Sequence, residues 1–142
     1  MQMALAEARA AAERGEVPVG AVLVRGSDLI ARDGNRTRER RDPTAHAEML
    51  VIQAGTARLK SERLIGCDLY VTLEPCAMCA AALSFARIRR LYFGAPDPKG
   101  GAVDNGPRFY SQPTCHHIPE VYGGIAERQA ADILRLFFQS RR

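Results

Sequence analysis

The amino-acid sequence predicts an α/β domain in which helices cover the faces of a mixed β-sheet. The chain has 142 residues, which is room for one domain of ordinary size, and we expect a single domain over residues 1–142. Its apolar residues change several times between the spacing of a helix and that of a strand. After an opening helix the order is β-β-α-β-α-β-(β)-α, an alternation typical of α/β proteins.

A helix and a hairpin are expected in the first third of the chain. The alanine-rich amphipathic start stops at Gly15, a residue type that favours the end of a helix. Two apolar runs follow, and the turn residues Gly26-Ser27-Asp28 between them indicate a β-hairpin. The expected elements are a helix over residues 2–14, strands over 19–25 and 29–32, and a loop over 33–43.

Helices and strands alternate in the remainder of the chain. Pro43 and Thr44 indicate a helix start, because proline is favoured in a first turn and threonine can cap it. Pro75 indicates a second start of the same kind, and the stretch 94–119, rich in Gly and Pro, is expected to be mostly loop. The expected elements are helices over residues 45–57, 75–86 and 126–139, and strands over 68–72, 90–93 and 120–122.

Composition and patterning exclude the membrane-spanning and disordered classes. Hydrophobic residues make up 46% of the chain and charged residues 25%, as in a globular protein. The longest apolar runs, such as residues 20–24 and 133–138, are far short of the roughly 18 residues of a membrane span. The start also lacks the basic end and apolar centre of a signal peptide. We therefore expect a cytoplasmic protein with no membrane partner and with reduced cysteines.

The positive charge is carried almost entirely by arginine. The net charge is +4, and only two of the 20 basic residues are lysines, Lys60 and Lys99. Arginine binds phosphate and stacks on bases better than lysine, but for the overall excess we favour GC-rich codon usage. The densest group lies in residues 32–41. This group is consistent with a basic rim that contacts RNA or with a solvated charged loop.

Two short motifs at expected helix starts carry the chemistry. Cys76 and Cys79 are three residues apart on one helix face, which suits two sulfur ligands to one zinc ion, and His46 can supply a third. Three protein ligands leave the fourth tetrahedral position for water, as in a catalytic zinc site. Glu48 lies two residues after His46 and is then expected to carry protons beside the metal without binding it.

Each motif alone has another interpretation. A Cys-x-x-Cys pair can be a redox pair, and an isolated histidine is more often a buried polar residue than a ligand. The pair can also be half of a structural zinc site, whose fourth ligand would have to come from the remaining cysteines and histidines, namely Cys67, Cys115, His116 and His117. The joint occurrence of both motifs favours one catalytic zinc ion per chain.

These motifs resemble the signature of the zinc-dependent nucleobase deaminases. The resemblance is to the branch of bacterial tRNA adenosine deaminases and covers nearly the whole chain. Besides the two motifs, it includes the stretches Glu16-Val17-Pro18-Val19-Gly20-Ala21-Val22, Asn35-Arg36, Asp42-Pro43-Thr44-Ala45, Tyr70-Val71-Thr72-Leu73-Glu74, Arg87-Ile88 and Phe93-Gly94-Ala95. It implies a cytidine-deaminase-like three-layer α/β/α sandwich with a mixed five-stranded sheet, and a homodimer.

By this resemblance the substrate is the adenosine at the wobble position of a tRNA anticodon stem-loop, and the product is inosine. The zinc ion would activate water for attack on C6 of adenine, and Glu48 would act first as a base and then as an acid. Asn35 would bind the target nucleoside, and Val17, Ala47 and Pro75 would line its pocket. From the residues alone, Asn35 would be a turn residue.

Contacts to the rest of the RNA are expected from a loop and the C-terminal helix. Asp97 resembles a family loop residue near the ribose, where a carboxylate could bind the 2′-hydroxyl, and a simple turn is the other interpretation. Phe138 is a candidate for stacking on a loop base, although core packing is expected to take at least one of Phe137 and Phe138. The candidates for phosphate contacts are all basic, namely Arg36, Arg38, Lys99, Arg141 and Arg142.

Two other functions stay open on the sequence alone. A deaminase of free bases or nucleosides, for instance guanine or cytosine, would share the zinc chemistry and differ in its pocket. A non-catalytic, zinc-stabilised RNA-binding module is the alternative from another class. Glu48 disfavours it, because a structural zinc site has no use for a carboxylate that does not bind the metal.

Overall fold

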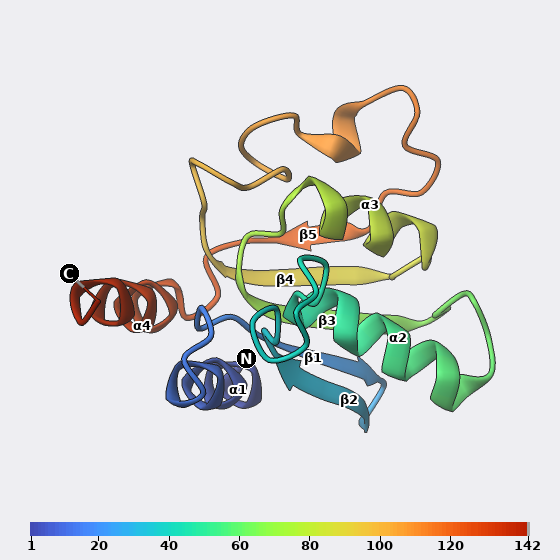
Figure 1. Ribbon diagram of the computed structural model, residues 1–142. Coiled ribbons are helices and arrows are strands. Elements are labelled where there is room, and N and C mark those ends of the chain that lie inside the picture. The colour runs from blue at the N-terminus through green and yellow to red at the C-terminus, as the bar shows by residue number, and fades with distance from the viewer. Residues whose placement is uncertain (142) are drawn as a thin grey trace.

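Five strands form one mixed sheet in the computed structural model, which describes residues 1–141 (Figure 1). The order across the sheet is β2-β1-β3-β4-β5. β1 is antiparallel to both of its neighbours, whereas β3, β4 and β5 run parallel to one another. The strands are β1 (Gly20–Arg25), β2 (Asp28–Gly34), β3 (Cys67–Leu73), β4 (Arg90–Ala95) and β5 (Glu120–Tyr122). The mixed five-stranded sheet expected from the sequence is confirmed.

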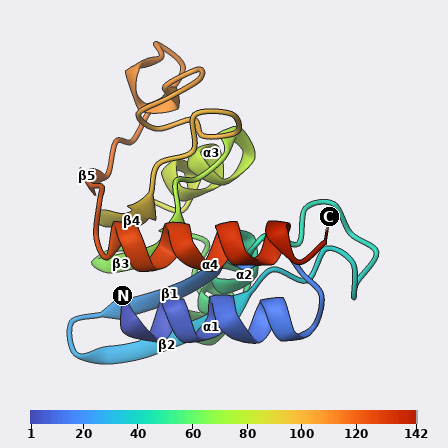
Figure 2. The same cartoon turned by 90° about the vertical axis from the view of Figure 1, so that its left-hand side faces the viewer.

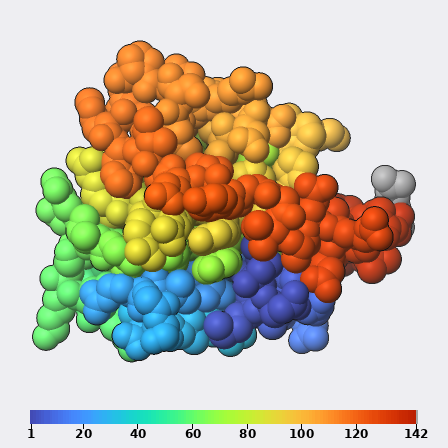
Figure 3. Space-filling model, turned by 180° about the vertical axis from the view of Figure 1, so that it is seen from behind, coloured from blue at the N-terminus to red at the C-terminus, as the bar shows by residue number. Residues whose placement is uncertain are grey.

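The helices cover both faces of this sheet, which is therefore the middle of three layers. One face carries the first and last helices, which contact each other and lie side by side in Figure 2. Figure 3 shows the same pair from behind, with the red-orange C-terminal helix next to dark blue α1. The other two helices pack on the opposite face. The helices are α1 (Gln2–Glu13), α2 (Ala47–Leu59), α3 (Ala77–Phe85) and α4 (Glu127–Gln139).

Glycine permits the close approach of α1 and α4 to the sheet. A Cβ atom on Gly20 would overlap the backbone of α1 at Ala4, and one on Gly94 would lie 2.9 Å from the Cβ of Ala130 in α4. Large side chains fill the opposite side of the sheet. The main core lies between the sheet and α2 and α3, and its largest buried members are Leu23, Val51, Leu64, Leu69, Val71, Leu83, Ile88, Leu91 and Phe93.

The structure corrects the predicted starts of two helices. α2 begins at Ala47, two residues later than expected, and its N-cap is His46. Thr44 is not the cap, because its hydroxyl and backbone N–H both donate to the Asp42 carboxylate, at 2.7 and 2.8 Å. α3 likewise begins at Ala77 and not at Pro75. In both cases a candidate metal ligand, His46 or Cys76, occupies the N-cap position with extended backbone angles.

Strand β2 is longer than predicted, since it continues through Asp33 to Gly34. A single turn of 3-10 helix, Phe109–Ser111, interrupts the long loop between β4 and β5. None of the helices within residues 1–141 is long and apolar enough to cross a membrane.

Candidate functional site

The two chemical motifs meet at one end of the sheet. His46 is the N-cap of α2 and Cys76 is the N-cap of α3, each with extended backbone angles. Cys79 lies in the first turn of α3 and is fully buried. The strand that leads into α3 ends at Leu73, so the site lies at the carboxyl end of β3, where α/β proteins commonly bind ligands.

The spacing of the three candidate ligands fits a tetrahedral zinc ion. The Nδ1 atom of His46 lies 3.6 Å from the Sγ atom of Cys76 and 3.5 Å from that of Cys79. Zinc bonds of about 2.3 Å to sulfur and about 2.0 Å to nitrogen, at a tetrahedral angle, place such atoms about 3.5 Å apart. The ligand atoms of all three residues lie within 4.8 Å of one another. The geometry therefore fits a metal site with three protein ligands.

A structural site with a fourth protein ligand is not formed. Within residues 1–141 the only cluster of three or more His, Cys, Asp or Glu side chains at ligand spacing is His46, Cys76 and Cys79. Cys67 is buried in β3, and the Sγ atom of Cys115 contacts the carbonyl of His117 at 3.2 Å. The fourth position is thus open to a ligand that the chain does not supply.

The two thiols differ in their affinity for protons. A hydrogen bond from Cys79, together with one from His46, lowers the pKa of the Cys76 thiol to about 4. The same bond to Cys76, together with burial, raises the pKa of Cys79. The hydrogen bond to Cys76 also raises the pKa of His46. Binding of a metal ion must therefore displace the proton from Cys79.

Glu48 lies in the same cavity as His46, although the two residues are only two positions apart. In a regular helix they would point about 200° apart. The extended backbone of His46 (φ −74°, ψ 152°) removes this restriction, because only Glu48 is inside the helix. Its side chain is 4% exposed, and burial raises the pKa of its carboxyl. A buried carboxyl of raised pKa beside a metal site is suited to take up a proton and return it.

A cavity of about 320 Å³ opens over these residues. Its volume suits a small ligand such as a nucleobase, and its wall mixes apolar and polar groups. The lining residues are Val17, Val19, Asn35, Thr37, His46, Glu48, Leu73, Glu74, Cys76, Asp97 and Gly100. The structure thus places four of the proposed nucleoside and catalytic residues, Val17, Asn35, Glu48 and Asp97, around one cavity.

Asn35 connects the cavity to the start of α2. Its side-chain oxygen accepts a hydrogen bond from the backbone N–H of Ala47 at 2.8 Å. This bond satisfies one of the free N–H groups at the start of the helix. This bond fixes the orientation of the side chain, whose NH₂ group can donate to a ligand in the cavity.

Two other residues that were expected to line the pocket, Ala47 and Pro75, lie behind the residues that line the cavity. Ala47 is fully buried and Pro75 is buried, and neither is among the cavity-lining residues. Asp97 lines the cavity and also forms a turn, because its Oδ1 atom accepts the backbone N–H groups of Lys99 and Gly100 at 3.2 and 3.0 Å. Both sequence interpretations of Asp97 are therefore compatible with its position.

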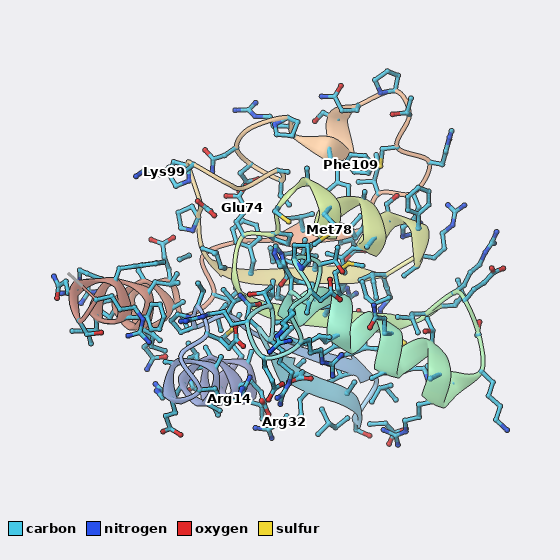
Figure 4. The ribbon with its side chains drawn as sticks, viewed as in Figure 1. Arg14, Arg32, Glu74, Met78, Lys99 and Phe109 are labelled. Atoms are coloured by element: carbon cyan, nitrogen blue, oxygen red, sulfur yellow. The ribbon has the colours of Figure 1, made fainter. Side chains whose placement is uncertain are left out.

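The candidates for RNA contact are spread over three elements. Arg36 forms ion pairs with Asp33 and Glu39, both at 2.8 Å. Arg38 donates to the carbonyl of Gly15 at 3.2 Å, and Lys99 points outward from its loop (Figure 4).

The remaining candidates are Phe138, in the C-terminal helix α4, and the two arginines that follow this helix in the sequence. Phe137 is buried, as core packing requires, while Phe138 is 50% exposed and does not line the cavity. The guanidinium of Arg141 lies 3.8 Å from the ring centre of Phe137. Arg142 falls outside the described residues.

Sequence reasoning missed Glu16 and Glu74 as functional candidates. Both side chains are almost fully buried, and each accepts hydrogen bonds from a loop that contributes to the cavity. Hydrogen bonds, among them those from the Asp97 N–H and the Asn105 side chain, outweigh burial and hold the pKa of Glu74 below its ordinary value. The only sequence signal is a charged residue inside an otherwise apolar motif.

Known deaminases are similar to this chain over its whole length. The family model described as MafB19-like deaminase matches residues 1–142. The tRNA-specific adenosine deaminase of Agrobacterium fabrum is 66% identical over 142 residues, which are 100% of this chain and 93% of that protein.

Solved structures of deaminases also superpose on this chain. A structure from a study of A-to-I editing by tRNA:A34 deaminases at the wobble position of transfer RNA superposes with a TM-score of 0.93 at 67% identity, covering 94% of this chain and 97% of that one. A guanine deaminase from Bacillus subtilis is more distant. It superposes with a TM-score of 0.65 at 28% identity, covering 99% of this chain and 90% of that one.

Proposed function

Because this chain belongs to the MafB19-like deaminase family, we propose that it deaminates the wobble adenosine of a tRNA anticodon stem-loop to inosine. One observation carries the type of reaction: three candidate zinc ligands cluster beside a cavity that has room for a base, and two of them, His46 and Cys76, line it together with the buried Glu48. The choice of substrate is supported by the 66% identity to a tRNA-specific adenosine deaminase over the whole chain.

Zinc is the metal we propose for His46, Cys76 and Cys79, one ion per chain. When bound with an open fourth position, it supplies Lewis-acid activation of water near neutral pH. Glu48 takes the proton of the water that attacks C6 and delivers it to a ring nitrogen. It then takes the proton of the hydroxyl now bound to C6 and delivers it to the amino group, which leaves as ammonia when the C–N bond breaks and C6 becomes the carbonyl carbon of inosine.

The other cavity residues hold the nucleoside. The free amide nitrogen of Asn35 donates to it, and Val17 contacts the base with an apolar side chain that is 37% exposed. Behind the wall, Ala47 supplies the N–H that fixes the Asn35 oxygen, and Pro75 accepts the N–H of Ala102 at 2.9 Å. These two residues therefore support the pocket from outside it.

We further propose a cytoplasmic homodimer. The outer surface of α2 and α3 carries apolar side chains, among them Phe85, which is 76% exposed, and Ile52. An exposed aromatic side chain in such a surface is typical of a protein contact. The thiol ligands require reducing conditions, and within residues 1–141 all four cysteines are free.

The proposed function is tested by parallel assays of the zinc-loaded protein. An anticodon stem-loop with adenosine at the wobble position should yield inosine and ammonia, whereas free guanine and cytosine should yield little ammonia. The guanine deaminase from Bacillus subtilis makes guanine the most informative competitor. Turnover of guanine faster than that of the stem-loop would replace the proposal with a free-base deaminase.

A substitution of Asp97 tests how the site selects RNA. Asp97→Asn keeps the oxygen that accepts the N–H groups of Lys99 and Gly100, but removes the second carboxylate oxygen as an acceptor. If that oxygen binds the 2′-hydroxyl, the preference for a stem-loop over one with a single deoxyadenosine should fall about tenfold or more. The ratio of the two kcat/KM values at fixed salt measures this preference.

The exposed Asp104 in the same loop gives a matched control. Asp104→Asn should leave the ratio at its wild-type value. An unchanged ratio in Asp97→Asn would show that Asp97 serves only in the turn.

Salt dependence tests the C-terminal arginines. Replacing Arg141 and Arg142 by alanine should flatten the plot of log affinity against log salt by about 0.7 to 0.9 for each lost phosphate contact. Binding to the stem-loop is measured between roughly 50 and 200 mM salt, where such contacts have their effect. Arg135→Ala is the control, because Arg135 lies in α4 and already pairs with Asp132 at 3.0 Å. The same slope in all three proteins would mean that these arginines do not contact RNA.

A further inference from the structure

Two buried carboxylates lie beside the cavity without a cationic partner. Glu16 is 1% exposed and Glu74 is 2% exposed. Neither forms an ion pair within residues 1–141. A buried carboxylate is costly unless its oxygens are hydrogen-bonded, so the partners of these two groups indicate what they stabilise.

Glu74 accepts five hydrogen bonds from one loop. Its Oε1 atom accepts the backbone N–H of Asp97 at 2.9 Å and the side-chain amide of Asn105 at 2.7 Å. Its Oε2 atom accepts three consecutive backbone N–H groups, from Val103, Asp104 and Asn105, at 2.9 to 3.1 Å. The loop from 97 to 105 is thus gathered around a single side chain, which Figure 4 shows against the loop that carries Lys99.

The packing around Glu74 leaves no spare room. A Cβ atom on Gly101 would lie 2.5 Å from both Cδ and Oε2 of Glu74. Only glycine at this position lets the loop close over the carboxylate.

Glu16 holds a second loop in the same manner. Its Oε1 atom accepts the backbone N–H of Arg38 at 3.0 Å, and its Oε2 atom accepts that of Glu39 at 2.8 Å. The hydroxyl of Thr37 also donates to Oε1, at 3.5 Å. This loop follows Asn35 and carries the basic residues between β2 and α2.

Both loops reach the substrate cavity. Thr37 and Asp97 each contact one of the two carboxylates and also line the cavity. The loops themselves have little regular structure, and these hydrogen bonds are among the contacts that fix their shape. Hydrogen bonds to an ionised acceptor are about twice as strong as neutral ones, which makes a buried carboxylate an effective anchor for a loop.

On the basis of the proposed function, we infer that Glu16 and Glu74 are positioning residues that fix the two RNA-facing walls of the cavity relative to the metal ligands. Each acts through the loop it holds and does not touch the reacting atoms. If the loops are already ordered before the substrate arrives, binding does not have to pay the entropic cost of ordering them. Loss of either anchor should therefore weaken substrate binding more than it slows the chemical step.

Glu74→Gln is the main test. Glutamine has the same shape, but its NH₂ group cannot accept the N–H donors that now face a carboxylate oxygen. We expect backbone amides in residues 97–105 to exchange with deuterium about tenfold faster or more, with zinc content unchanged. We also expect KM for the stem-loop to rise about tenfold or more while kcat changes little. Glu16→Gln should give the same result with the faster exchange in residues 36–41.

Asp68→Asn is the matched control. Asp68, in β3, is also a buried carboxylate, but it pairs with Arg89 at 2.7 Å and does not line the cavity. Its loss should leave KM and the exchange of both loops at their wild-type values. If Glu74→Gln fails to fold, Gly101→Ala provides a second variant, because its methyl group displaces the carboxylate without changing it.

The outcomes separate this inference from the proposed function. Deuterium exchange needs no turnover, so it reports on the loops even if the wild-type protein does not act on the stem-loop. Wild-type exchange in the anchored loops of folded, zinc-loaded Glu74→Gln and Glu16→Gln would overturn the inference. A fall in melting temperature with unchanged KM would do the same, since it would show a role in stability alone.

Discussion

Replacing Glu48 with alanine should abolish turnover while the protein keeps its zinc. Glu48 does not belong to the ligand cluster, yet its buried carboxyl lines the same cavity as His46 and Cys76. A positioned general acid and base contributes about 100-fold to 10,000-fold to a rate, and Glu48 is proposed to serve as both. We expect kcat on the stem-loop to fall by at least that factor. Zinc per chain, measured by elemental analysis, should stay near one.

The conservative variant Glu48→Gln refines this test. It preserves the shape of the side chain and can still donate a hydrogen bond, but it cannot take up the proton of water. It should therefore be as inactive as Glu48→Ala and should bind the stem-loop normally. Loss of zinc from either variant, to the extent seen on replacing a cysteine ligand, would contradict the role of proton carrier.

Replacing Cys79 with alanine should remove both zinc and activity. Cys79 is fully buried at the start of α3, and its Sγ atom is one of the three donors. With only His46 and Cys76 left, the affinity for zinc should fall so far that dialysis removes the metal. Because a metal ion bound by these residues would crosslink the starts of α2 and α3, the melting temperature should fall as well.

Cys115→Ala provides the control for this substitution. Cys115 is a free cysteine outside the cluster, where its Sγ atom contacts the carbonyl of His117. It should keep one zinc per chain and full turnover. If Cys79→Ala retained stoichiometric zinc, the ligand set would have to be revised.

The periodic elements of the fold could be predicted from the sequence because their signals are local. The helix at the N-terminus ends beside Gly15, and β5 occupies the same residues, 120–122, as predicted. The predicted starts of α2 and α3 were each two residues too early. Asn35, twelve positions before Ala47, supplies the hydrogen bond at the start of α2, and a contact over that distance has no local signal.

Part of the candidate site could also be predicted from the sequence. The candidate ligands His46, Cys76 and Cys79 and the nearby Glu48 have a recognisable spacing in the sequence, and the structure brings all four together. The loop anchors could not be found in the same way. Glu74 accepts hydrogen bonds from residues 23 to 31 positions away, and these partners are mostly backbone N–H groups, which every residue except proline carries.

The most direct test of the proposed reaction is mass spectrometry of an anticodon stem-loop after incubation with the protein in water labelled with heavy oxygen. We expect inosine at the wobble position and at no other adenosine, with one labelled oxygen at C6 and one ammonia released per inosine. The Glu48→Ala protein, loaded with zinc, should leave the RNA unchanged. Unmodified wobble adenosine after incubation with the folded, zinc-loaded wild-type protein, or inosine that carries no labelled oxygen, would contradict the account.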